Sequence, residues 1–146
     1  MENVFSEIEQ NAWGGFLGTY SHINRLVEED LQSHSHLTHV EFEVLLRLNW
    51  EKDHRLRIQD IAAQSILTRS GVSRMVERLE KAGLVTREEA PEDRRGAYAV
   101  LTNAGAERFH AAAEAHMEFV RRNFLGLFSN EELKQMSGFW KRFEGK

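Results

Sequence analysis

The chain has 146 residues, 41% hydrophobic and 29% charged, a balance typical of one globular domain with its own core. It contains no cysteine, which excludes disulfides, thiolate metal sites and cysteine redox chemistry. The net charge of −4 is unlike that of a generally basic nucleic-acid-binding protein. The first residues lack the basic start and apolar run of a signal peptide, and no apolar run approaches the roughly 18 residues of a membrane span. We therefore expect a cytoplasmic protein without a membrane partner.

Helical patterns occupy the first third of the chain. Apolar residues recur every three or four positions over residues 5–31, which predicts one long helix, and residues 32–37 are predicted to be a connector. Thr38 followed by Glu41 forms a capping box and predicts the start of a second helix. The core face of this helix is expected to hold Phe42, Leu45, Leu46 and Asn49.

Two short helices and a β-hairpin are predicted next. Residues 58–64 form a compact helix with Ile61 and Ala62 facing inward, and Thr68 caps a further helix over residues 69–82 that ends before Gly83. Residues 84–89 and 97–101 are predicted strands, joined by a polar turn over residues 90–96. This order is that of a winged helix-turn-helix, whose second helix enters the DNA major groove.

The helix over residues 69–82 has two faces. At 100° per residue, Val72, Val76 and Leu79 fall on one side, with Met75 at its edge. The opposite side carries Ser70, Ser73, Arg74, Glu77 and Lys81. Residues 69–81 hold four basic and two acidic side chains, so this segment is basic although the rest of the chain is acidic. Hydroxyl groups beside an arginine are suited to contact DNA phosphates and base edges. The alternative interpretation of this face is an ordinary solvated helix surface.

The last third of the chain is predicted to be helical and rich in apolar residues. Thr102 caps a helix that extends to about residue 125, and Ser129 with Glu132 forms a second capping box that opens a final helix to the C-terminus. These helices hold more large apolar residues than the periphery of a small monomer can bury, which favours a dimer. They are Phe119, Val120, Phe124, Leu125, Leu127, Phe128, Leu133, Met136, Phe139, Trp140 and Phe143.

Taken together, these segments resemble the multiple-antibiotic-resistance-type (MarR) regulators. The matching residues are Ile61-Ala62, Ser73-Arg74-Met75-Val76-Glu77-Arg78-Leu79-Glu80-Lys81-Ala82-Gly83-Leu84-Val85, Asp93-Arg94-Arg95-Gly96 and Leu101-Thr102-Asn103-Ala104-Gly105. The resemblance implies a mainly α fold of six helices with a small β-hairpin wing. It also implies a homodimer intertwined through residues 1–37 and 103–146, with residues 38–102 as the DNA-binding region.

By the same resemblance, the chain is a transcriptional regulator that binds double-stranded DNA at a pseudo-palindromic operator, acts as a repressor, and leaves DNA when a small organic ligand binds. The expected major-groove residues are Arg74 and its neighbours Ser70 and Ser73, and Arg95 takes the minor-groove role at the wing tip, braced by Asp93. The full predicted DNA-binding set is Thr68, Arg69, Ser70, Ser73, Arg74, Glu77, Arg94 and Arg95. No cofactor is expected, and the chain contains no GxSxG, Walker or HExxH motif of an enzyme.

The predicted ligand pocket holds Trp13, Phe16, Tyr20, Phe42, Glu43 and Arg87, with packing against the core or a second subunit as the alternative for its aromatic residues. In a urate-responsive branch of the family a tryptophan, an acidic residue and two arginines bind the ligand. Trp13, Glu43 and Arg87 lie at comparable places here, but Met75 stands where that branch has an arginine.

Two other functions remain open from the sequence. His34, His36 and His39 lie close together, and His110 precedes Glu114 by one turn. Such residues ligate zinc in a metal-responsive branch of the same family, so a metal-responsive regulator of the same fold is the alternative, although the spacing is irregular and we predict no metal site. A winged helix can also bind proteins instead of DNA. The basic residues in the 69–82 helix and at the wing tip favour DNA.

Overall fold

The computed structural model describes residues 4–63, 67–91 and 96–144. The chain divides into two compact units, Met1–Asp30 with Ala115–Lys146, and Leu31–Glu114. The α-helices are α1 (Glu7–Ser35), α2 (His39–Trp50), α3 (Ile58–Ala63), α4 (Arg69–Lys81), α5 (Asn103–Asn123) and α6 (Asn130–Trp140). The strands are β1 (Arg55–Arg57), β2 (Val85–Glu89) and β3 (Ala97–Leu101), and two short 3₁₀ turns are η1 (Leu125–Leu127) and η2 (Lys141–Phe143). The predicted mainly helical fold with a small sheet is confirmed.

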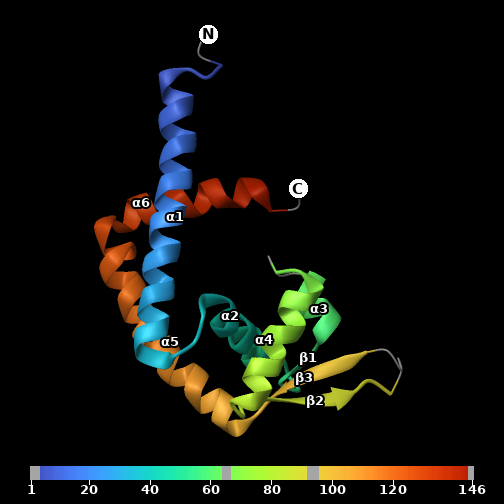
Figure 1. Ribbon diagram of the computed structural model, residues 1–146. Helices are drawn as coiled ribbons and strands as arrows, with labels where there is room; N and C mark the ends of the chain where they lie inside the picture. Colours follow the sequence, from blue (N-terminus) through green and yellow to red (C-terminus); the bar gives the residue numbers. More distant parts are fainter. Residues whose placement is uncertain (1–3, 64–66, 92–95, 145–146) are drawn as a thin grey trace. The chain divides into compact units, whose positions relative to one another are not determined.

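The second unit, Leu31–Glu114, is a winged helix-turn-helix. Its sheet has the order β1-β3-β2, with both pairs antiparallel, and β2 and β3 form an arm that projects beyond α3 and α4 (Figure 1). Side chains from α2, α3, α4 and the sheet form its core. The largest that are fully buried are Leu31, Leu45, Leu48, Ile61, Val72, Met75, Val76, Leu79 and Val85.

The end of α1 differs from the prediction. The sequence indicated a connector over residues 32–37, but the helix continues to Ser35, whose buried hydroxyl donates a hydrogen bond to the Leu31 carbonyl at 2.6 Å. His36 then adopts the left-handed conformation, with φ of 56°, and ends the helix. Residues 32–34 are polar and exposed, so this last turn carried no apolar periodicity from which it could be predicted.

The buried face of α2 differs from the predicted one at two positions. Phe42 and Leu45 are buried as predicted, but Val44 and Leu48 complete the face in place of Leu46 and Asn49, which are only half-buried. Both sets recur every three or four residues. Because apolar residues surround much of this helix, its periodicity could not distinguish between the two faces.

A strand that the sequence analysis missed, β1, pairs with β3. Its three residues Arg55, Leu56 and Arg57 lie opposite Val100, Ala99 and Tyr98. A strand of this length is too short to show an alternating pattern. Its partners lie more than 40 residues further along the chain, so only the tertiary fold defines it.

The first unit combines the larger part of α1 with the end of α5, η1, α6 and η2. The predicted long helix ending near residue 125 stops at Asn123, whose side-chain amide donates to the Phe119 carbonyl at 2.9 Å. The predicted capping box opens α6: Ser129 accepts from the Glu132 backbone, and the hydrogen bond that the Ser129 backbone donates to Glu132 lowers the pKa of that carboxyl. The helix does not run to the C-terminus, because η2 replaces it after Trp140.

Candidate nucleic-acid interface

Helix α4 is fixed at both ends by local hydrogen bonds. The Thr68 hydroxyl caps its N-terminus by accepting from Gly71 N at 3.1 Å. At the other end Gly83 has a φ of 73°, Gly83 N donates to Glu80 O, and Leu84 N donates to Leu79 O at 2.9 Å. This pair of bonds is a Schellman motif, which needs the left-handed residue that glycine supplies. The predicted cap and terminator are therefore confirmed.

The two predicted faces of α4 are also present. Val72, Met75, Val76 and Leu79 are 0–2% exposed and pack into the core of the second unit. The predicted DNA-facing residues Thr68, Arg69, Ser70, Ser73, Arg74 and Glu77 are all exposed. The hydroxyls of Thr68 and Ser70 lie 3.1 Å apart at the start of the helix. These six side chains are therefore accessible to a ligand, and their role in binding DNA stays a prediction.

The four basic side chains of α4 fall into two classes. Arg78 Nη2 lies 2.9 Å from Glu41 Oε1, and Lys81 Nζ lies 2.9 Å from Glu77 Oε1. The hydrogen bond from Lys81 lowers the pKa of the Glu77 carboxyl. Arg69 and Arg74 form no ion pair or side-chain hydrogen bond with any residue that the structure describes. The uncompensated positive charge therefore lies in the first half of α4.

The β2–β3 arm is anchored to α4 through Arg87. Its Nη2 donates to the Ser73 carbonyl at 3.3 Å, and its Nε lies 3.3 Å from Glu80 Oε2. Ala90 N donates to Gly96 O at 3.2 Å and closes the described part of the arm. The predicted tip residues Asp93, Arg94 and Arg95 lie outside the described residues.

Two arginines of β1 form a second cationic cluster that the sequence analysis did not single out. The guanidinium carbons of Arg55 and Arg57 lie 4.4 Å and 5.7 Å from the centre of the Tyr98 ring. Arg55 also lies 3.8 Å from Glu88. The run of charged residues that leads into Arg55 was the signal available in the sequence, but the contact with Tyr98 depends on the pairing of β1 with β3.

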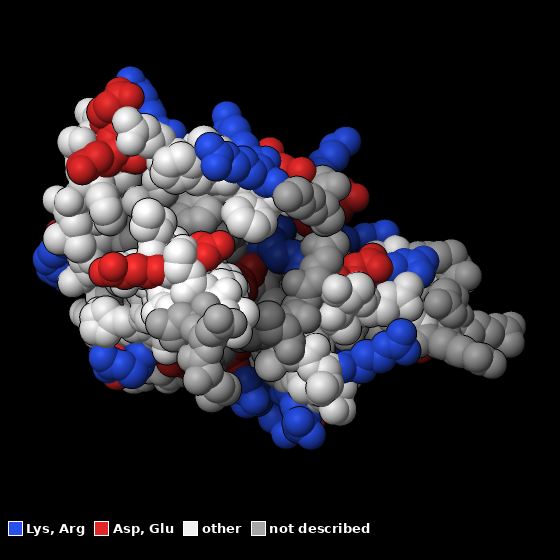
Figure 2. All heavy atoms as spheres, turned by 90° about the horizontal axis from the view of Figure 1, so that it is seen from above, with Lys and Arg blue, Asp and Glu red and all other residues white. Residues whose placement is uncertain are grey.

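Charges of both signs are interspersed over the face of the molecule drawn in Figure 2. The acidic side chains are thus not concentrated in one broad region of that face. What the candidate interface can bind depends on the charged side chains close to α4.

The residues predicted for a ligand pocket divide between the two units. On α1, the rings of Trp13 and Phe16 are stacked at 5.8 Å, and those of Phe16 and Tyr20 at 6.4 Å. In the other unit, Phe42 is buried against Phe109 with their ring centres 5.5 Å apart. Glu43 is exposed and lies 3.5 Å from His39, and Arg87 contacts α4 as described above. The pocket as a whole stays a prediction.

The histidines of the predicted cluster contact near neighbours in the sequence. His39 pairs with Glu43, and the His34 ring lies 2.9 Å from the Ser33 hydroxyl. Among residues 4–63, 67–91 and 96–144, no group of three or more histidine, cysteine, aspartate or glutamate side chains could hold a metal ion. In the same described ranges, no helix is long and apolar enough to cross a membrane.

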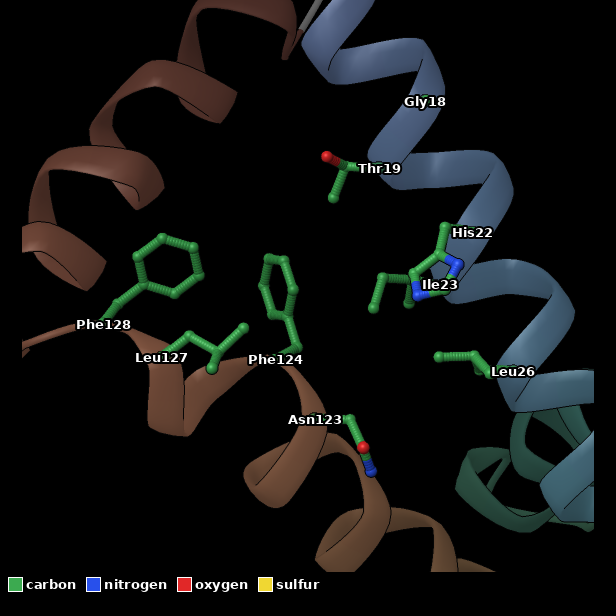
Figure 3. A pocket seen from close by; sticks show the side chains of 9 residues that line it. All are labelled: Gly18, Thr19, His22, Ile23, Leu26, Asn123, Phe124, Leu127 and Phe128. Atoms are coloured by element: carbon green, nitrogen blue, oxygen red, sulfur yellow. The ribbon is translucent and has the colours of Figure 1, made fainter.

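The first unit exposes many large apolar side chains. Of its described hydrophobic residues, only Val27 and Phe119 are buried. The exposed ones are Val4, Phe5, Ile8, Trp13, Phe16, Leu17, Tyr20, Met117, Leu125, Leu127, Phe139, Trp140 and Phe143. A pocket of about 460 Å³ lies in the same unit, with Ile23 and Leu26 of α1 on one side and Phe124, Leu127 and Phe128 on the other (Figure 3). Such a surface is typical of a protein interface.

Comparison with known proteins identifies relatives of this fold. The MarR family model matches residues 37–96. The crystal structure of AbsC, a MarR family transcriptional regulator from Streptomyces coelicolor, is 32% identical, with a TM-score of 0.86 and 99% of each chain covered. Sco3205, a MarR family transcriptional regulator from the same organism solved in complex with DNA, is 29% identical, with a TM-score of 0.87, and the match covers 95% of this chain and 87% of that one.

Curated relatives match over shorter regions. An uncharacterized HTH-type transcriptional regulator of Bacillus subtilis, YkoM, is 32% identical over 76 residues, which is 52% of this chain and 49% of YkoM. The chain spans about half to three fifths of the length of the two curated relatives it matches, 49% of one and 60% of the other.

Proposed function

The chain belongs to the MarR family of transcriptional regulators, and we propose that it binds double-stranded DNA as a homodimer and represses transcription from a pseudo-palindromic operator. The observation that carries this proposal is the exposed first half of α4, where Arg69 and Arg74 lie beside the hydroxyls of Ser70 and Ser73 without an acidic partner among the described residues. The DNA complex of Sco3205 supports it.

The roles of the side chains follow from their chemistry. In the major groove a guanidinium binds guanine O6 and N7 together, and small hydroxyls let the helix approach the phosphates. We assign the first role to Arg74 and phosphate contacts to Thr68, Arg69, Ser70 and Ser73, with Glu77 and its partner Lys81 at the edge of the contact. We propose that Arg94 and Arg95 reach the minor groove, braced by Asp93, because a narrow minor groove attracts arginine.

Replacement of Arg74 by alanine tests the assignment. The probe is a duplex enriched from a random library by repeated binding to the wild-type protein, and failure to enrich any sequence would refute sequence-specific binding. The variant should bind this duplex about 1–3 kcal/mol more weakly and lose discrimination against a scrambled duplex. Fluorescence anisotropy measures both affinities. Lys134→Ala is the control, since Lys134 is an exposed basic residue of α6 outside the proposed DNA contact, and it should change the affinity less than about threefold.

We propose that a small organic anion weakens DNA binding and that Arg87, one of the predicted ligand residues, binds its acidic group. The guanidinium of Arg87 can donate two hydrogen bonds to a carboxylate. Arg87 also donates a hydrogen bond to the Ser73 carbonyl of α4. A ligand that binds Arg87 more tightly when α4 is displaced from its DNA-binding position therefore shifts the protein toward that displaced position.

A thermal-shift screen of phenolic acids, purines and divalent metal ions tests this switch. At least one compound should raise the melting temperature and also release the enriched duplex, and Arg87→Gln should abolish that release. If every stabilising compound leaves the DNA affinity unchanged, the ligand switch is wrong, whereas DNA binding itself would stand.

A further inference from the structure

Helix α4 is attached to α2 by a buried carboxylate. Glu41 Oε1 accepts from Arg78 Nε at 3.0 Å and lies 2.9 Å from Arg78 Nη2. Its other oxygen, Oε2, accepts from Thr38 N at 2.9 Å in the capping box of α2. The Glu41 side chain is only 9% exposed. Both oxygens of one carboxylate are therefore used, one within α2 and one on α4.

The location of Arg78 on α4 links this contact to the proposed DNA interface. Arg78 follows Arg74 by four residues, so the two side chains leave α4 on nearly the same side. Arg78 is 59% exposed even when it is paired. Without Glu41, Arg78 would be an unpaired cation one helical turn from Arg74. It could then contact DNA phosphates whatever the base sequence.

We propose that Glu41 is a positioning residue for DNA recognition. It fixes the orientation of α4 against α2, and it withholds the charge of Arg78 from the DNA backbone. Both effects favour sequence-specific over non-specific binding, because phosphate contacts carry no sequence information and base contacts require a fixed helix. The inference rests on the proposed function, in which α4 contacts DNA.

The variant Glu41→Gln separates these effects from simple damage to the fold. Glutamine can still accept the hydrogen bond from Thr38 N, so the cap of α2 is kept while the ion pair is lost. Glu132→Gln is the matched control, since Glu132 fills the same place in the capping box of α6 and forms no salt bridge with a basic residue in the described part of the chain. Both variants lose one negative charge. Circular dichroism melts establish that each is folded at the assay temperature.

Anisotropy titrations on the enriched and scrambled duplexes, at several salt concentrations, provide the readout. For Glu41→Gln we expect about fivefold or more weaker binding to the enriched duplex and equal or tighter binding to the scrambled one. The freed Arg78 should also steepen the dependence of log affinity on log salt by about one per protomer on the scrambled duplex. Loss of charge alone would tighten binding to both duplexes, and a destabilised fold would weaken both.

Two further variants test the contact from the side of Arg78, and the first of them keeps the proposal testable if Glu41→Gln folds poorly. Arg78→Lys keeps the charge but cannot contact Glu41 through two nitrogens, and it should give a smaller loss of discrimination. The double variant Glu41→Gln/Arg78→Gln should lose no more affinity for the enriched duplex than Glu41→Gln, and its salt dependence should return to that of the wild type.

A discrimination ratio for Glu41→Gln equal to that of Glu132→Gln would overturn the positioning role, as would a double variant that binds the enriched duplex more weakly than Glu41→Gln does. Failure of the wild-type protein to distinguish the two duplexes would instead overturn the proposed function. The two failures are therefore distinguishable.

Discussion

Replacing Gly105 by alanine should destabilise the protein by about 3 kcal/mol or more, since the new methyl group has no space. A Cβ at this buried position overlaps the Leu84 carbonyl and lies 2.8 Å from Leu101 Cδ1. The leucine side chain can move, but the carbonyl accepts a hydrogen bond from Thr102 N at 3.1 Å. The Thr102 hydroxyl in turn donates to Gly83 O at 2.7 Å and accepts from Gly105 N at 2.9 Å. These bonds hold the start of α5 against the turn after α4, so neither backbone can retreat.

Chemical denaturation at a fixed protomer concentration measures the effect, because the stability of an oligomer depends on concentration. Ala104→Ser is the control. Ala104 is the exposed neighbour of Gly105 in α5, and one added atom there should change the stability by less than about 0.5 kcal/mol. A Gly105→Ala variant with wild-type stability would show that α5 can separate from the turn, contrary to the packing described here.

Local signals were the part of the fold that could be predicted well. The capping residues Thr38, Thr68 and Ser129 each begin a helix, and Gly83 ends α4. Each of these features depends on residues within a few positions of one another, so the sequence displays it directly. The faces of α4 were predictable for the same reason, since four apolar residues recur along a helix with few other apolar positions.

Features that depend on distant residues could not be predicted. Glu41 was recognised as a cap, but its contact with Arg78 joins residues 37 positions apart, and no local pattern indicates it. The sequence likewise does not show which basic residues of α4 form ion pairs: Arg78 and Lys81 do, whereas Arg69 and Arg74 form none with any residue that the structure describes. Net charge is thus a weaker guide to this interface than the distribution of ion pairs.

Replacing Leu127 by arginine should convert a dimer into folded monomers. Leu127 is 71% exposed and lines the pocket of the first unit, so it contributes little to the fold of one chain (Figure 3). If a second copy covers this surface, a twofold axis places Leu127 in the interface twice. Losing two buried leucines costs about 3–6 kcal/mol, and burial of the introduced charges adds to this. The dimer dissociation constant should therefore rise by about a thousandfold or more.

Sedimentation equilibrium at micromolar concentration measures the change. The wild-type protein should sediment with twice the mass of one chain, and Leu127→Arg with the mass of one chain and an unchanged helical signal in circular dichroism. Leu127→Met, which preserves the volume, and Gln59→Arg, which adds the same charge to an exposed residue of α3, should both remain dimers. A monomeric wild-type protein would refute the dimer. A dimeric Leu127→Arg variant with the wild-type dissociation constant would place the interface on another surface, because a symmetric interface cannot tolerate two unpaired arginines in its apolar centre.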